Sequence, residues 1–167
     1  MVTLPRVVKL AVVGAGGAGK TTLISRLITG SFISHKMTVG FDVESWTVVP
    51  DGSNSVKVSC FDFGGQKQFR FFQGALVTGS KIALILVDCT SFHSLLEIHE
   101  WMPMISQIPN GRKVLVGTKI DLPCVVSSED LQEQAENLGI HHMMVSSKTG
   151  ENFDDLVNFL CHMIDEM

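Results

Sequence analysis

Eight consecutive residues near the N-terminus are of types that can hold phosphate. They match the pattern G-x-x-x-x-G-K-[ST] in full and are Gly14, Ala15, Gly16, Gly17, Ala18, Gly19, Lys20 and Thr21. Glycines let consecutive backbone N–H groups point at phosphate oxygens, the lysine adds a full charge, and the threonine hydroxyl can bind Mg²⁺. We assign Thr22 to the same site. The loop predicts a nucleotide phosphate site but does not choose the base, because ATPases and nucleotide kinases share it.

The elements around this loop argue against an incidental glycine-rich stretch. A β-branched, buried strand is predicted over 7–13 and an amphipathic helix over 20–29, so the helix N-terminus adds its partial positive charge to the phosphate site. Further strands are predicted over 39–49, 55–61, 82–87, 114–117 and 141–146, and further helices over 92–107, 127–137 and 153–164. This alternation predicts an α/β fold with a mostly parallel central sheet, one antiparallel edge strand and helices on both faces.

Two of these helices carry local signals. In the helix predicted over 92–107 we expect a kink at Pro103, because proline removes a helical N–H. In the helix predicted over 127–137, Ser127 and Asp130 form a predicted capping box, and Gly139 closes the helix.

Composition limits the class of protein. The 167 residues suit one domain, residues 1–167, and the net charge of −4 argues against binding of nucleic acid. No apolar run could span a bilayer and no lipidation signal is found, so we expect that membrane association is not encoded in this chain. We expect buried free thiols, and therefore a cytoplasmic location, from the four widely spaced cysteines, Cys60, Cys89, Cys124 and Cys161. We also expect a monomer. The six histidines show no ligand spacing tied to a site, and we expect surface or core positions for them.

Four more short motifs follow the phosphate loop in order. They lie at residues 38–42 (TVGFD), 62–66 (DFGGQ), 118–121 (TKID) and 146–148 (SSK). With these five motifs the whole chain resembles the Ras superfamily of small GTPases, and the implied fold is the G domain of P-loop NTPases. The first of the four looks like the effector loop of Rab-type members, the second like Arf-type proteins and the third like Rho-type members.

The resemblance implies a guanine site, and its physics is consistent. Asp121 presents two carboxylate oxygens to the two adjacent N–H donors of guanine, and adenine would leave that carboxylate unpaired. The stem of Lys119 can lie along the base. By resemblance, further members of this site are Thr118, Ser146, Ser147, Lys148 and, stacked edge-on against the base, Phe32.

The resemblance also implies a two-state device built on Mg²⁺. Thr21, Thr38 and Asp62 would hold the ion, Asp62 through water. Thr38 would reach it only when a γ-phosphate pulls its loop inward, and Gly65 would donate its N–H to that phosphate. Hydrolysis of GTP to GDP would then release both loops.

Catalysis is assigned by resemblance to Gln66, which would orient the attacking water, and to Lys20, which would stabilise charge on the phosphates. Gly16 matches a position where a side chain would crowd Gln66. No arginine occurs in residues 31–40, and Arg70 is the one local candidate for an internal substitute. We therefore expect slow intrinsic hydrolysis that needs an activating protein.

The sequence thus predicts a switch that binds GTP/GDP with Mg²⁺ and is read by effectors. Effectors, exchange factors and GTPase-activating proteins would bind through residues about 31–49 and 62–80. The alternative is a nucleotide-binding scaffold that does not cycle, and the joint presence of Thr38, Gln66 and Gly16 argues against it. A small-molecule phosphotransferase is a third reading, for which no acceptor site or arginine-bearing lid is visible.

Overall fold

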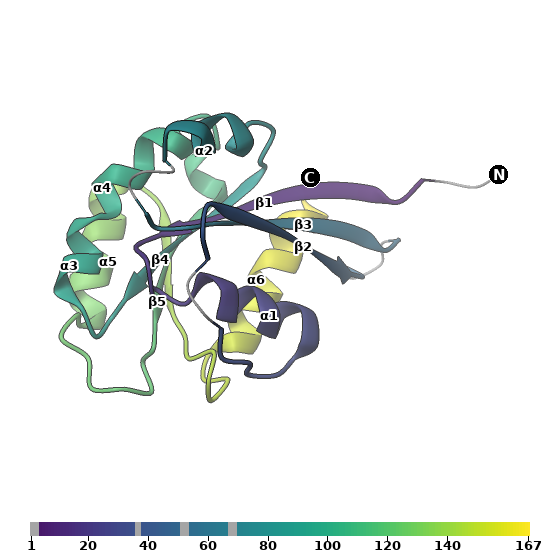
Figure 1. Cartoon of the computed structure of the whole chain (residues 1–167). Coiled ribbons are helices and arrows are strands. Elements are labelled where there is room, and N and C mark those ends of the chain that lie inside the picture. Colours follow the sequence, from purple (N-terminus) through teal and green to yellow (C-terminus); the bar gives the residue numbers. More distant parts are fainter. Residues whose placement is uncertain (1–3, 36–37, 51–53, 67–69) are drawn as a thin grey trace.

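A six-stranded sheet organises the molecule, with strand order β2-β3-β1-β4-β5-β6 (Figure 1). The computed structural model describes residues 4–35, 38–50, 54–66 and 70–167. The strands are β1 (Arg6–Gly14), β2 (Phe41–Val48), β3 (Val56–Phe63), β4 (Ile82–Asp88), β5 (Lys113–Thr118) and β6 (His141–Met144). Neighbouring strands are parallel except β2 and β3, which are antiparallel. The predicted, mostly parallel sheet with one antiparallel edge strand is confirmed.

Helices cover both faces of the sheet, as predicted (Figure 1). They are α1 (Lys20–Thr29), α2 (Arg70–Val77), α3 (Phe92–Leu96), α4 (Ile98–Trp101), α5 (Ser128–Leu138) and α6 (Phe153–Asp165), with the 3₁₀-helices η2 (Met102–Ile105) and η3 (Asn110–Arg112). Leu23 of α1 and Leu160 of α6 belong to one apolar cluster. Val77 of α2, Trp101 of α4 and Leu131 of α5 belong to a second cluster across the sheet. The inner strand β4 is apolar from Ile82 to Val87 because both of its faces are covered.

The predicted helix over 92–107 is wrong as a single element. The chain forms α3 and α4, which meet at Glu97, and then continues as η2. Pro103 lies in η2, where the missing N–H is tolerated by a tighter turn. The signals of α5 are confirmed: Ser127 Oγ accepts from the Asp130 N–H at 3.1 Å, and the Asp130 carboxylate accepts from the Ser127 N–H at 3.0 Å.

Two other expectations need correction. The strand predicted over 141–146 ends at Met144, because Ser146 donates its N–H to the Glu151 carbonyl in a loop instead. The cysteines are free, but only Cys60 and Cys89 are buried, whereas Cys124 is exposed. The segment between β2 and β3 includes residues 51–53, which lie outside the described residues. No helix in the described ranges has the length and apolar character needed to cross a membrane.

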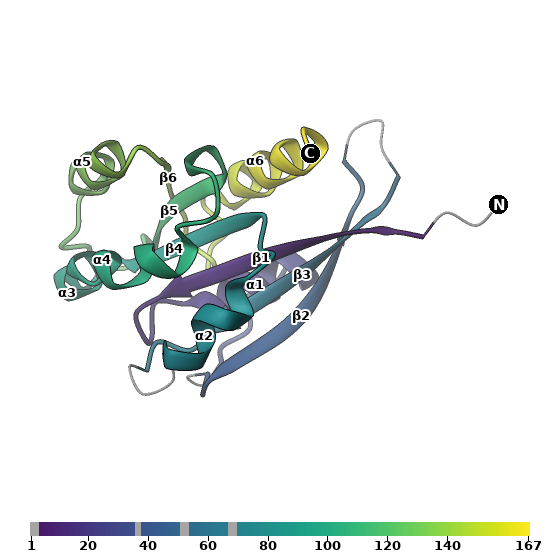
Figure 2. The ribbon, with the colours of Figure 1, turned by 90° about the horizontal axis from the view of Figure 1, so that it is seen from above.

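The topology brings four loops together. The segments after β1, β3, β5 and β6 all leave the carboxyl ends of parallel strands, which meet at one edge of the sheet. The opposite ends of β1, β2 and β3 extend beyond the helices (Figure 2). The predicted motifs are therefore neighbours in space.

Candidate functional site

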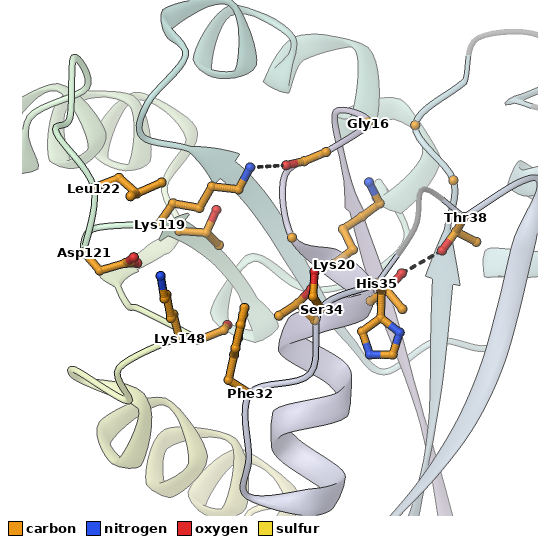
Figure 3. A pocket seen from close by; sticks show the side chains of 18 residues that line it. Gly16, Lys20, Phe32, Ser34, His35, Thr38, Lys119, Asp121, Leu122 and Lys148 are labelled. Atoms are coloured by element: carbon orange, nitrogen blue, oxygen red, sulfur yellow. Dashed lines mark hydrogen bonds between the residues drawn. The ribbon is translucent and has the colours of Figure 1, made fainter.

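A pocket of about 510 Å³ opens among these loops, within the size range of small-molecule sites. Residues of all five motifs line it. The predicted residues on its wall are Gly16, Gly17, Gly19, Lys20, Thr21, Thr22, Phe32, Thr38, Gly65, Thr118, Lys119, Asp121, Ser147 and Lys148. The predicted residues outside the lining are Gly14, Ala15, Ala18, Asp62, Gln66 and Ser146. Figure 3 shows Asp121, Lys148 and Phe32 toward one end of the pocket, and His35 and Thr38 toward the other.

The phosphate loop connects β1 to α1 and holds its lysine inside. Gly19 takes the left-handed conformation at the N-terminus of α1. Lys20 is buried, and its Nζ donates to the carbonyls of Gly14 at 2.9 Å and Ala15 at 2.8 Å. A cationic group therefore lies at the base of the pocket beside the first turn of α1, an arrangement that suits an anion.

Three side-chain oxygens meet next to this lysine. The hydroxyl oxygens of Thr21 and Thr38 are 2.6 Å apart, and both hydroxyls donate to Asp62 Oδ2, that of Thr38 at 3.1 Å. Asp62 is buried, and its Oδ1 has no hydrogen-bond partner among the described residues. Oxygen ligands with one free anionic oxygen fit Mg²⁺. Across the described ranges, no group of three or more histidines, cysteines or carboxylates offers another metal site.

The segment that contains Gln66 packs directly against the phosphate loop. A Cβ added at Gly65 would lie 2.0 Å from the Gly16 backbone nitrogen, so this approach requires glycine. The buried Oε1 of Gln66 has no partner among the described residues. The Gln66 amide is therefore buried without a hydrogen bond at that oxygen. The side chain of Arg70, the candidate for an internal arginine, lies outside the described residues.

The loop after β5 is tied to the phosphate loop by two side chains. Thr118 Oγ1 donates to the Ala18 carbonyl at 2.7 Å and to the Val87 carbonyl at 3.2 Å. Lys119 has a left-handed backbone conformation, with φ of 62°, and its Nζ donates to the Gly17 carbonyl at 2.6 Å. Hydrogen bonds therefore join the predicted guanine end of the site to the predicted phosphate end.

Sequence reasoning missed Asp88, which anchors Lys119. Asp88 Oδ2 accepts from Lys119 Nζ at 2.9 Å, and Asp88 Oδ1 accepts from the Thr90 hydroxyl at 2.5 Å. Burial would raise the pKa of Asp88, but the hydrogen bonds from Thr90 and Lys119 and the charge of Lys119 lower it overall. Asp88 therefore stays ionised near neutral pH. The sequence signal that could have identified Asp88 is its position at the carboxyl end of β4.

The carboxylate of Asp121 is oriented by the neighbouring loop. Ser146 Oγ donates to Asp121 Oδ1 at 2.8 Å and accepts from the Thr149 N–H at 3.0 Å. Ser146 is buried behind the pocket, while Asp121 and Ser147 line it. Asp121 therefore faces the cavity with its orientation set from behind.

Arg26 of α1 supports the same loop from the other side. Its Nη1 donates to the Ser147 carbonyl at 2.8 Å and to the Lys148 carbonyl at 3.5 Å. The guanidinium lies 5.4 Å from the centre of the Phe153 ring. No sequence motif includes Arg26, so only the fold reveals this support.

The loop before Thr38 contributes aromatic and polar groups. Phe32 is 44% exposed and lines the pocket, so it is not a core residue. His35 is exposed, as expected, but it also lines the pocket, and its Nε2 lies 2.6 Å from Ser25 Oγ. Its place shortly before Thr38 was the signal that could have identified it. Ser34 and Leu122, which no motif includes, also line the pocket, as does Gly64 of the motif at residues 62–66.

Comparison with known proteins finds one matching family and a set of similar chains. The Ras family model matches residues 9–166. The chain is 32% identical over 152 residues to the Ras-related protein RABD2c of Arabidopsis thaliana, covering 88% of this chain and 75% of that protein. It is 31% identical over 152 residues to the Ras-related protein Rab-1D of Dictyostelium discoideum, covering 88% and 74%. It is 30% identical over 165 residues to the Ras-related protein SEC4 of Candida albicans, covering 96% and 78%.

Proposed function

Because the chain belongs to the Ras family of small GTPases, we propose that it is a guanine-nucleotide switch that hydrolyses GTP slowly. It binds GTP or GDP with Mg²⁺, and effectors recognise the GTP-bound loops. The observation that carries this proposal is the convergence of Lys20, Thr21, Thr38 and Asp121 on one pocket, with Asp62 accepting from both threonine hydroxyls. An all-oxygen cation site beside a buried lysine suits a nucleotide polyphosphate.

Base selection is the task of Asp121. Its carboxylate accepts from the N1 and exocyclic N2 donors of guanine, whereas adenine presents no matching pair. Ser146 donates to one oxygen of the Asp121 carboxylate and so fixes the plane in which this carboxylate pairs with guanine. Lys119 and Phe32 flank the base, and Arg26 holds the loop that carries Ser147 and Lys148.

Thr38 and Gly65 distinguish the GTP-bound state from the GDP-bound state. Mg²⁺, when bound, would neutralise charge on the phosphates. Thr21, Asp62 and Thr38 would hold it, Thr38 only while a γ-phosphate is present. Gly65 donates its N–H to that phosphate from the segment against Gly16. Loss of the γ-phosphate therefore releases both loops together.

Hydrolysis depends on Gln66, which orients the attacking water, and on Lys20, which stabilises charge developing on the phosphates. Residues 31–40 supply no arginine, and an arginine finger is worth about 10³–10⁵ in rate. Intrinsic turnover is therefore slow, and a GTPase-activating protein completes the site. Effectors, exchange factors and activating proteins bind through residues 31–49 and 62–80.

Two measurements on the purified chain test the proposal. Competition binding with Mg²⁺ should favour GDP over ADP by more than about 10³-fold, because a site built to pair polar groups rejects a ligand that lacks them. Single-turnover hydrolysis should be slow in the wild type and should be lost in Gln66→Leu. Tight guanine binding with equal, negligible hydrolysis in both proteins would instead support a scaffold that does not cycle.

A further inference from the structure

A glutamine of α2 lies completely buried at the junction of the two loops that the proposed switch moves. Gln73 is 0% exposed. Its Nε2 donates to the Gly40 carbonyl at 2.8 Å and to the Gly64 carbonyl at 3.0 Å. Its Oε1 has no hydrogen-bond partner among the described residues. Burying an amide is costly unless it is paired, so both donor contacts matter to its position.

The two carbonyls belong to two segments of the chain that meet beside the pocket. Gly40 follows Thr38 and precedes β2, and Gly64 follows Asp62 at the end of β3. The Gly64 N–H also donates to the Gly40 carbonyl at 2.8 Å. The Gly40 carbonyl therefore accepts from both Gly64 and Gln73, and the amide of Gln73 bridges the two loops.

The segments that carry Gly40 and Gly64 are in close contact at this point. A Cβ added at Gly64 would lie 2.6 Å from the Thr38 carbonyl oxygen and 3.0 Å from that of Gly40. The Gly40 carbonyl is also held by the Gly64 N–H, so the Thr38 loop would break the bridge by carrying Gly40 with it. Gln73 would then lose one of its two acceptors, and its amide would be left partly unpaired.

We propose that Gln73 is a positioning residue that couples the Thr38 loop to the Gly64–Gln66 segment and favours the GTP-bound arrangement. The inference rests on the proposed function. Gln73 does not line the pocket, so it acts through Gly40 and Gly64 rather than by touching nucleotide. Closure of the Thr38 loop on a γ-phosphate secures the Gly64 carbonyl through Gln73. The backbone that carries Gly65 and Gln66 is then held in register with the phosphate.

The test uses Gln73→Met, which keeps the length of the side chain and removes its donors. The exposed residue Gln107 provides the matched control Gln107→Met. In Gln73→Met the affinity for a non-hydrolysable GTP analogue should fall about tenfold and single-turnover hydrolysis should slow about tenfold. The affinity for GDP should stay within about twofold, because the contacts of the phosphate loop and Asp121 are unchanged. Gln107→Met should match the wild type.

Two results would overturn the coupling role. One is an unchanged preference for the GTP analogue over GDP in a folded Gln73→Met protein. The other is an equal loss of affinity for both nucleotides, which indicates a purely structural role. If Gln73→Met does not fold, Gln73→Asn, which shortens the amide by one methylene, is measured with the same expectation. A wild-type protein that neither prefers the GTP analogue over GDP nor hydrolyses GTP would contradict the proposed function. Failure of the proposed function is therefore distinguishable from failure of the coupling role of Gln73.

Discussion

The hydroxyl oxygens of Thr21 and Thr38 lie 2.6 Å apart, although one residue opens α1 and the other precedes β2. Both hydroxyls donate to the same oxygen of Asp62. The loop that carries Thr38 is therefore folded onto the phosphate end of the pocket. This is the arrangement that the proposed GTP-bound state requires.

Removal of the Thr38 hydroxyl should weaken the GTP state alone. In Thr38→Ala, affinity for a GTP analogue with Mg²⁺ should fall about tenfold, because a charge-assisted contact is lost. Affinity for GDP should change by less than about twofold. Equilibrium titration with both nucleotides checks this, and the exposed Thr47→Ala in β2 serves as the control. An equal loss for both nucleotides would contradict a role restricted to the GTP state.

The buried hydroxyl of Thr118 should contribute to both stability and nucleotide retention. Thr118→Val keeps the shape but leaves the Ala18 and Val87 carbonyls without this donor. The free energy of unfolding should fall by about 1–3 kcal/mol, as measured by urea denaturation. GDP should also dissociate faster. Thr118→Ser, which retains the hydroxyl, should recover most of both losses, and failure to do so would assign the effect to packing.

Arg26 should control nucleotide release without affecting chemistry. In Arg26→Met the loop of Ser147 and Lys148 loses its hydrogen bonds from the guanidinium. GDP dissociation should accelerate about tenfold, in line with the loss of charged hydrogen bonds. The single-turnover rate of bound GTP should not change. Arg112→Met in η3 is the matched control, and slower hydrolysis in Arg26→Met would show that the arginine acts elsewhere.

The thiols should react in an order set by exposure and pKa. Burial raises the pKa of Cys60 to about 12, with a smaller contribution from Glu44, and burial raises that of Cys89 to about 12. Because the thiolate is the reactive form, iodoacetamide at pH 7.5 should modify the exposed Cys124 first. Cys60 and Cys89 should react only after unfolding. Peptide mass mapping checks the order, and early modification of Cys60 in folded protein would contradict it.

Sequence reasoning succeeded where the signal is local. The phosphate loop needs a strand, glycines and a helix start within one segment, and all three can be read from the chain. The capping box of Ser127 and Asp130 is equally local. The prediction of one helix over 92–107 failed because the chain divides at Glu97 and continues as a 3₁₀-helix at Pro103.

Residues that act across the fold could not be found in this way. Gln73 contacts Gly40 and Gly64, which lie in other elements, and Arg26 contacts Ser147 from the far end of the sequence. Neither residue belongs to a motif. Their roles depend on distances that only the assembled sheet and helices define.

Amide hydrogen exchange in the GDP-bound and GTP-analogue-bound states tests the central claim most directly. A switch predicts stronger protection in the GTP-analogue state at residues 38–40 and 64–66, with equal protection at the phosphate loop and residues 146–148. Protection that is identical in the two states throughout the chain would contradict a switch and would indicate a scaffold that holds nucleotide without reading its γ-phosphate.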